Sequence, residues 1–194
     1  MKLKRIALAG VALIVLAGTT ATIYAETETP TATLDISGGV LSLATAAVTL
    51  DALTLDGTQQ LTASAAASNT WTVVDSRGTG DGWNVTVKST DFSDGGSNTL
   101  VLGGAVRKFK IQLTAANITF IAGGGGVTTA AAGLTEIPTG VAPPLKIASA
   151  ASGGVAGTGT NELNPNFTLD IPADTLVGNG TYTATLTVTV STGP

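Results

Sequence analysis

The clearest pattern in the chain is a strict alternation of apolar and polar residues near its end. Over residues 181–190, threonine alternates with a set of apolar residues, which are Tyr182, Ala184, Leu186, Val188 and Val190. Successive side chains of a β-strand point to opposite faces. The pattern therefore predicts a half-buried antiparallel strand with a threonine-coated outer face.

Shorter β signals follow one another through most of the chain. They are runs rich in Val, Ile, Thr and aromatic residues, bounded by Gly, Asn and Asp, as is typical of strands separated by turns. No segment has sustained helical periodicity, so the sequence predicts an all-β fold, an antiparallel β-sandwich or a barrel-like single domain. The predicted strands cover residues 33–36, 40–43, 47–50, 60–65, 70–75, 83–89, 107–113, 118–122, 145–148, 167–171 and 181–190.

Two stretches between these runs lack any strand pattern. Residues 123–126 are all glycine, and residues 149–161 are rich in Gly, Ala, Ser and Thr. Neither stretch can bury much apolar surface. Both are predicted to be mobile, low-complexity loops.

The first 25 residues follow a different order. Lys2, Lys4 and Arg5 precede an apolar run over residues 6–17, and a small polar stretch ends at Ala25. This order is typical of a secretory signal peptide. Twelve apolar residues are too few to span a bilayer as a helix, which needs about 20. An uncleaved membrane anchor is the alternative.

The predicted organisation is a signal peptide over residues 1–25, a polar lead-in over 26–32 and one β domain over 33–194. The last residues, from Ser191 to Pro194, carry no sorting motif, membrane tail or basic anchor. We expect any attachment to a cell to be noncovalent.

Composition narrows the chemistry. Histidine and cysteine are both absent, which removes Ser-His-Asp and Cys-His catalysis, zinc sites built on these residues, haem, iron–sulfur clusters and disulfides. Charged residues are 11% of the chain, against about a quarter in an average protein. We expect no enzymatic activity and no cofactor. A carboxylate pair for glycoside hydrolysis is the remaining enzymatic alternative, but no acidic residue has a setting that would raise its pKa.

The charge balance speaks against nucleic acid as a partner. Three of the nine basic residues lie in the first five positions, so the chain beyond residue 25 has six basic and 13 acidic residues, a net charge of −7. Nucleic-acid binding needs a clustered basic surface.

The most informative stretch is two strands around a glycine-rich loop at residues 76–82. Trp71 opens the first strand and Trp83 the second. Trp83 is either a core anchor beside the turn or an exposed stacking platform for a sugar or peptide. The order of residues is Trp71-x-Val-x-Asp75-x-Arg77-Gly78-x-Gly80-x-Gly82-Trp83-Asn84-Val85.

This order resembles the first signature of the WxL domain, found at the C-terminus of surface proteins of Gram-positive bacteria. The end of the chain is similar to the family's second signature, with Val188 in place of its tryptophan and Val190 in place of its leucine. Val85 likewise stands where the first signature has leucine. The residues that carry the resemblance are Trp71, Trp83, Val85, Tyr182, Leu186, Val188 and Val190.

The resemblance implies a secreted all-β module held noncovalently at the cell wall, with peptidoglycan as its ligand. The absence of the second tryptophan leaves another envelope polymer as an alternative. We expect the ligand contacts to be Trp83 and the polar residues Asp75, Arg77 and Asp81. Arg77 could hold a carboxylate or phosphate with two hydrogen bonds, or form an ion pair with Asp75 or Asp81.

Two further clusters have ordinary interpretations beside functional ones. Asp75 with Asp81, and the acidic and polar residues of 91–98, offer oxygen ligands for calcium, but Asp-Gly and Ser-Asn clusters are also common turn sequences. The basic run 107–110 could contact an anionic wall polymer or guard a solvated strand edge with lysine.

The sequence thus favours a cell-surface protein bound noncovalently to the wall. The alternative is a structural subunit of an extracellular fibre or surface matrix assembled by β-strand contacts, for which the free polar N-terminal segment would suit strand donation. Its partners would be other surface proteins or copies of itself.

Overall fold

The computed structural model describes residues 30–58, 60–64, 69–103, 107–173, 175 and 178–194. The expected signal peptide and the first part of the lead-in, residues 26–29, lie outside these ranges. The chain divides into two units, Met1–Ile36 and Ser37–Pro194. In the first unit, residues 30–36 have no regular secondary structure and their side chains are exposed. The strand predicted at residues 33–36 is therefore not formed.

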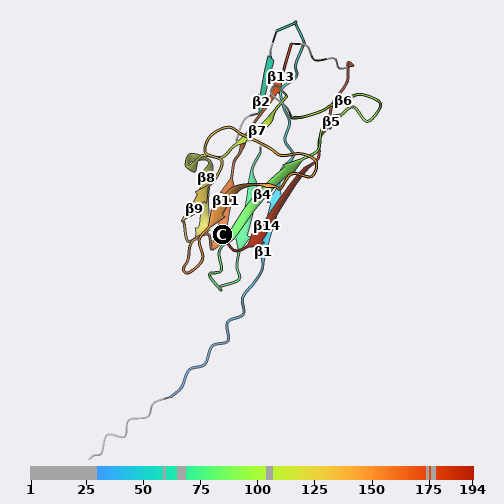
Figure 1. Ribbon diagram of the computed structural model, residues 1–194. Helices are drawn as coiled ribbons and strands as arrows, with labels where there is room; N and C mark the ends of the chain where they lie inside the picture. Colours follow the sequence, from blue (N-terminus) through green and yellow to red (C-terminus); the bar gives the residue numbers. More distant parts are fainter. Residues whose placement is uncertain (1–29, 59, 65–68, 104–106, 174, 176–177) are drawn as a thin grey trace, which may run out of the picture. The chain divides into compact units, whose positions relative to one another are not determined.

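The second unit is built from open antiparallel sheets (Figure 1). Sheet A has the order β1 (Leu41–Thr45), β3 (Trp71–Asp75), β12 (Gly159–Leu163), β8 (Ile118–Gly123). Sheet B has the order β10 (Thr135–Glu136), β7 (Phe109–Gln112), β13 (Asn166–Ile171), β2 (Gln60–Ser64). Sheet C has the order β14 (Leu186–Thr192), β4 (Trp83–Ser89), β11 (Leu145–Ala150), β9 (Val127–Thr129). A fourth sheet pairs β5 (Phe92–Ser93) with β6 (Thr99–Leu100), and one 3₁₀ helix covers Ala115–Asn117.

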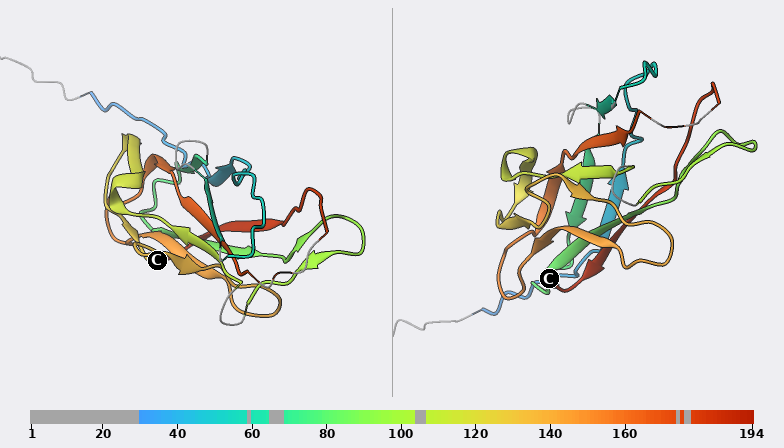
Figure 2. Two further views of the ribbon diagram at one scale, coloured as in Figure 1. Left: turned by 90° about the horizontal axis from the view of Figure 1, so that it is seen from above. Right: turned by 45° about the horizontal axis from the view of Figure 1, so that its top comes forward.

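These sheets confirm the all-β prediction and its sandwich form rather than the barrel-like one. Figure 2 shows them from two further directions, layered around a shared interior. No helix in the described part of the chain has the length and apolar character needed to cross a membrane.

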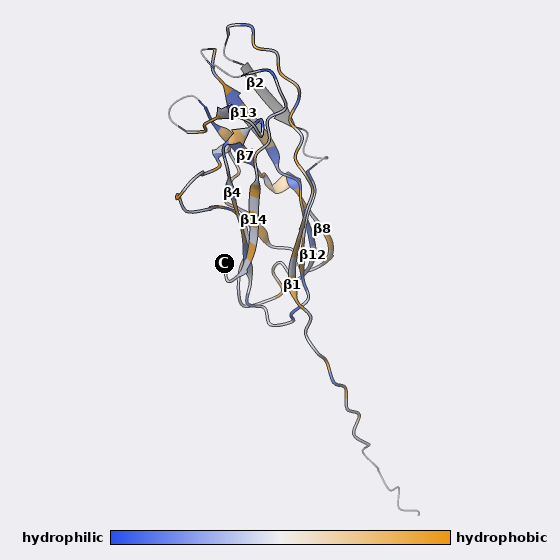
Figure 3. Cartoon of the chain, turned by 90° about the vertical axis from the view of Figure 1, so that its right-hand side faces the viewer, coloured by the Kyte–Doolittle hydropathy of each residue, from blue (hydrophilic) through white to orange (hydrophobic). Residues whose placement is uncertain are grey.

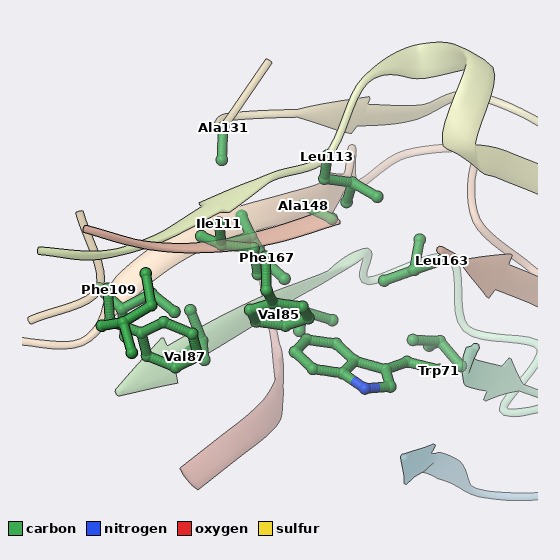
Figure 4. Packing of buried hydrophobic residues seen from close by; sticks show 14 of the residues in the cluster. Trp71, Val85, Val87, Phe109, Ile111, Leu113, Ala131, Ala148, Leu163 and Phe167 are labelled. Carbon is green, nitrogen blue, oxygen red and sulfur yellow. The ribbon is translucent and has the colours of Figure 1, made fainter. Parts of the chain in front are cut away.

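The interior is filled by the inward-facing residues of β3, β4, β7, β11 and β13. A row of aromatic rings runs through it. The ring centroids of Trp71 and Phe167 are 5.8 Å apart, and those of Phe167 and Phe109 are 5.6 Å apart. The centroids of Phe109 and Phe92 are 5.2 Å apart. Figure 4 shows Trp71, Phe167 and Phe109 among the aliphatic side chains of the core. Offset and edge-on ring contacts of this kind add to the stabilisation from area burial.

The predicted alternation of the last strand is confirmed over residues 186–190. Leu186, Val188 and Val190 are half-buried against the core, and the threonines between them are exposed. Figure 3 shows the change between hydrophobic and less hydrophobic positions along β14. Residues 181–185 precede the strand but keep the alternation: Tyr182 and Ala184 are half-buried against the core, and Thr183 forms an isolated bridge with Ser93.

Two further predictions about loops and strands are wrong. The segment 149–161, predicted to be a mobile loop, contains the first half of β12, which lies between β3 and β8 in sheet A. The strand predicted at 47–50 is absent, although Val48 and Leu50 pack against the core from an irregular segment.

Candidate functional site

Asp75 and Arg77 lie at the start of the glycine-rich loop, where β3 ends. Asp75 is buried, with 4% of its surface exposed, because it falls on the inward-facing parity of β3. Arg77 folds back onto it: Nε donates to Asp75 Oδ1 at 2.9 Å and Nη2 donates to Oδ2 at 2.9 Å. A guanidinium and a carboxylate joined by two parallel hydrogen bonds form one of the stronger ion-pair geometries.

The same guanidinium reaches two other parts of the chain. Arg77 Nη1 donates to the Thr192 hydroxyl at 2.9 Å, and Nη2 donates to the Gly82 carbonyl at 2.8 Å. Its Nη1 also lies 4.0 Å from Asp81 Oδ2. Of the two roles considered for Arg77, the structure shows the ion pair. With 14% of its side chain exposed, Arg77 is enclosed by partners rather than presented to solvent.

The ion pair shifts both titrations in the direction that keeps the charges. Hydrogen bonds from the Arg77 side chain hold the pKa of Asp75 below its ordinary value, although burial acts in the opposite sense. The carboxylate of Asp75 raises the pKa of Arg77 for the same reason. The side chain of Asp81, in the same loop, is 54% exposed and accepts a hydrogen bond from the Thr79 hydroxyl at 2.6 Å.

Trp83 is a core anchor, and its interpretation as an exposed stacking platform is wrong. The residue is 0% exposed, and its indole Nε1–H donates to the Gly157 carbonyl at 3.0 Å. Gly157 has φ = +70°, and a Cβ there would lie 2.6 Å from the indole nitrogen. The loop before β12 can therefore approach the ring only because this position is glycine.

The two signatures of the chain meet in one place. Strand β14 pairs with β4 along its length, with Val190 opposite Val85 and Thr192 opposite Trp83. Beyond the strand, Asn84 Nδ2 donates to the Gly193 carbonyl at 2.8 Å, and the Gly193 amide donates to the Gly82 carbonyl at 3.3 Å. Together with the hydrogen bond from Arg77 to Thr192, these bonds hold the two signatures against each other. We call this place the joint between the signatures.

In the loop at residues 91–98, which was considered for calcium, the carboxylate oxygens of Asp94 accept hydrogen bonds from within the loop. In the turn between β5 and β6, Asp94 Oδ1 accepts from the Gly96 amide at 2.8 Å, and Oδ2 accepts from Asn98 Nδ2 at 2.6 Å. These bonds lower the pKa of Asp94. They are the usual contacts of an Asp turn, which supports the turn interpretation of residues 91–98.

The basic run 107–110 does not form a guarded edge, which corrects the prediction. Strand β7 lies between β10 and β13, so it is interior to sheet B. Lys108 Nζ lies 3.3 Å from Oε2 of Glu136 on β10, and Lys110 Nζ lies 2.5 Å from Oδ2 of Asp170 on β13. Both lysines are thus paired across the sheet.

A polar surface that the sequence analysis did not assemble covers the outside of sheet C. We call it the outer face of sheet C, and it is formed by the outward-facing residues of β14, β4, β11 and β9, which lie side by side in Figure 1. All its members are exposed or half-buried, and none is apolar or acidic. They are Thr187, Thr189, Ser191, Asn84, Thr86, Lys88, Lys146, Ser149 and Thr128.

The strand register arranges this face in three rungs. Thr187 is opposite Lys88 in the first rung, and Thr86 lies between Thr189 and Lys146 in the second. The third rung runs through Ser191, Asn84, Ser149 and Thr128. Ser191 Oγ donates to Asn84 Oδ1 at 3.1 Å, so the third rung is already hydrogen-bonded along part of its length.

Part of this face was visible in the sequence. The threonines of 181–190 were predicted to coat an outer face, and Asn84, Thr86 and Lys88 show the same alternation on β4. The pattern could not show that β14, β4 and β11 are neighbours, because pairing between distant segments leaves no mark in one strand's alternation.

Hollows lined by described residues also occur away from the joint between the signatures. A groove of about 820 Å³ runs between the irregular segments 48–55 and 178–184, with Phe92, Phe109 and Leu169 among the residues that line it. A smaller hollow of about 320 Å³ lies beside Lys88, lined also by Ser89, Thr90, Asp91, Gly140 and Thr187.

Comparison with curated proteins yields no match, and comparison with solved structures yields none. The family model described as "WxL domain surface cell wall-binding" matches residues 19–194, which include both signatures and every described strand. That family is one of binding domains, and its description makes the protein a cell-surface, cell wall-binding protein. The chain therefore belongs to the WxL domain family.

Proposed function

We propose that this protein is exported, is held at the cell wall without a covalent bond, and makes contact through the outer face of sheet C. The observation that carries the proposal is that nine polar side chains gather on one sheet face with no carboxylate and no apolar residue among them. The signature residues help to fix this surface, because Arg77 and Asn84 hydrogen-bond to Thr192 and Gly193 at the end of β14.

The face is suited to a polymer rich in hydroxyl and amide groups. Its hydroxyls donate and accept hydrogen bonds, and its lysines donate. Peptidoglycan, the ligand that the family resemblance implies, carries such groups along its glycan strands. Each exposed contact is weak, but a repeating polymer lets several act together, which raises the overall affinity.

Pelleting with purified cell walls tests the proposal. Thr189→Glu places a carboxylate in the middle of the outer face and should lower the fraction of protein that pellets. Thr119→Glu is the matched control, because Thr119 is an exposed threonine on an edge strand of another sheet, β8. Equal retention of the two folded variants would count against the outer face, and a wild type that never pellets would count against wall binding.

Export is tested separately by N-terminal sequencing of the protein recovered from the cell surface. The order of charge, apolar run and small-residue exit in residues 1–25 supports cleavage, so we expect a chain that begins at or near Glu26. A surface protein that begins at Met1 and extracts with membranes would favour the anchor instead.

One observation favours the second candidate function, assembly by strand contacts. Leu34 and Ile36 are 82% and 84% exposed, and they alternate with polar residues in a segment that pairs with no strand among the residues the structure describes. Exposed strand-like segments are templates for pairing with another chain. Light scattering of the purified mature chain tests this: assembly predicts oligomers that disappear in Leu34→Ser/Ile36→Ser, and a wild-type monomer at all concentrations contradicts it.

A further inference from the structure

Among the described residues of the second unit, two lysines take no part in the ion pairs. Arg77 pairs with Asp75, Lys108 with Glu136 and Lys110 with Asp170. Arg107 is half-buried beside its bridge to Gly103. Within the described residues, Lys88 and Lys146 form no ion pair.

These two lysines are neighbours on the outer face of sheet C. Lys146 on β11 is opposite Thr86 on β4, and Lys88 is two positions beyond Thr86 on the same strand. The two therefore stand in diagonal positions on adjacent strands, where neighbouring residues are about 7–8 Å apart and their Cβ atoms somewhat closer. A side chain of four methylene groups lets both ammonium groups reach one anion or two successive anions.

The surroundings of the lysines point to an anionic ligand. The threonines of the first two rungs, Thr187, Thr189 and Thr86, put hydroxyl donors beside the ammonium groups. The face holds no carboxylate that would compete for the lysines. It also holds no aromatic side chain on which a sugar ring could stack.

We infer that Lys88, Lys146 and the threonines around them bind the phosphodiester groups of an anionic cell-wall polymer. Lysine binds phosphate as a compact point charge, and phosphate oxygens accept several hydrogen bonds at once from ammonium and hydroxyl groups. The inference rests on the proposed function and names the ligand class that the same face takes.

The negative charge of the chain restricts where an anionic polymer can bind. The chain beyond residue 25 carries a net charge of −7, so most of its surface repels a polyanion. The hollow of about 320 Å³ beside Lys88 gives the polymer room for a substituent, and Asp91 on its lining disfavours a second anion there. The polymer is thereby directed along the rungs rather than into the hollow.

The experiment compares two wall preparations and two charge-matched variants. The preparations are complete walls and walls stripped of their phosphodiester polymers, which leaves peptidoglycan. The test variant is Lys88→Gln/Lys146→Gln. The control is Thr99→Glu/Thr119→Glu, which changes the net charge by the same amount at exposed strand positions of other sheets. Circular dichroism confirms that each variant is folded.

We expect the wild type to bind complete walls at least about tenfold more tightly than stripped walls, since only complete walls offer both lysines an anionic partner. Lys88→Gln/Lys146→Gln should lose about tenfold on complete walls and little on stripped walls, and the control should lose much less. A soluble glycerol-phosphate polymer should compete with complete walls for the wild type.

Three results would overturn the inference. Equal wild-type retention on both preparations would remove the phosphodiester ligand and leave wall binding in place. Equal losses in the two variants would reduce the effect to net charge. No retention on either preparation would remove the proposed function as well.

Discussion

At the end of β3, one guanidinium group connects three segments that are far apart in the chain. Arg77 is bonded to Asp75 before it, to the Gly82 carbonyl after it, and to Thr192 on β14. A charged residue of a binding-domain signature is thus used to hold the domain together. The exposed Asp81 is the member of the predicted polar set that is left facing solvent.

Removing Arg77 should therefore cost stability rather than a ligand contact. Arg77→Ala leaves the buried carboxylate of Asp75 without its partner, and breaking a buried pair in this way typically costs about 3 kcal/mol or more. Lys108→Ala breaks a more exposed pair and should cost about 1 kcal/mol or less. Urea unfolding measures both, and equal midpoints for the two variants would contradict the role assigned to Arg77.

The ion pair also predicts how stability depends on pH. The pKa of Asp75 is lower in the folded protein than in the unfolded chain, where it is about 3.9. Its ionised form therefore stabilises the fold at pH values above about 4, and this stabilisation is lost as the pH falls through the lower folded pKa.

In Asp75→Asn this contribution is missing at every pH. The variant should be less stable than the wild type at neutral pH, and its unfolding midpoint should fall less steeply below about pH 4. Urea midpoints at a series of pH values give the comparison. Parallel curves for the two proteins would show that Asp75 does not titrate differently on folding.

Individual strands differ in how clearly the sequence pattern predicts them. Strand β4 was predicted with its observed bounds and β14 with its faces, because each alternates buried and exposed residues. Strand β12 was missed, since Leu163 is its only large apolar residue and one of its buried positions is Asn161, which donates to the Gly157 carbonyl. A strand whose buried positions are one amide and one leucine has no hydrophobic period to detect.

The candidate site shows the same division. Alternation predicted that threonine coats β14, and this feature is present. Trp83 and Val85 lie on the buried face of β4, where the alternation of that strand places them. The ion-pair partners of Lys108 and Lys110, and the gathering of Lys88 with Lys146, depend on which strands are neighbours. That information lies in contacts between distant segments and not in any local pattern.

The faces of β14 give a test at the scale of one strand. Val188→Thr places a hydroxyl against the core and should destabilise the protein by about 1–2 kcal/mol. Thr189→Val changes the neighbouring, exposed position in the opposite sense and should alter stability by about 0.5 kcal/mol or less. If thermal or urea unfolding ranked the two variants the other way round, the register of β14 against β4 would be wrong.

For the molecule as a whole, the negative net charge works against binding to an anionic wall polymer. A strongly acidic chain approaches an anionic wall only through a face that carries positive charge, so the attachment should be electrostatic in part. Electrostatic interactions between exposed groups are screened over about 10 Å at 0.1 M salt and about 3 Å at 1 M.

Retention on complete walls should consequently fall as the salt concentration is raised from 0.1 M to 1 M. Circular dichroism over the same range provides the control, since the fold itself is held by burial and should not change. Salt-independent retention would mean that neutral hydrogen bonds carry the attachment, and the lysines would then have no part in it.

The joint between the two signatures also determines when the domain can be completed. Arg77 and Thr192 are 115 positions apart in the chain, and Asn84 and Gly193 are 109 apart. A chain that emerges from a ribosome or crosses a membrane with its N-terminus leading exposes β4 long before β14 arrives, and closing so long a loop is slow. Until residues 186–193 have emerged, Asp75 has its arginine and β4 can pair with β11, but β4 lacks β14, the second of its two neighbours. The outer face of sheet C is therefore complete only once β14 is free to pair.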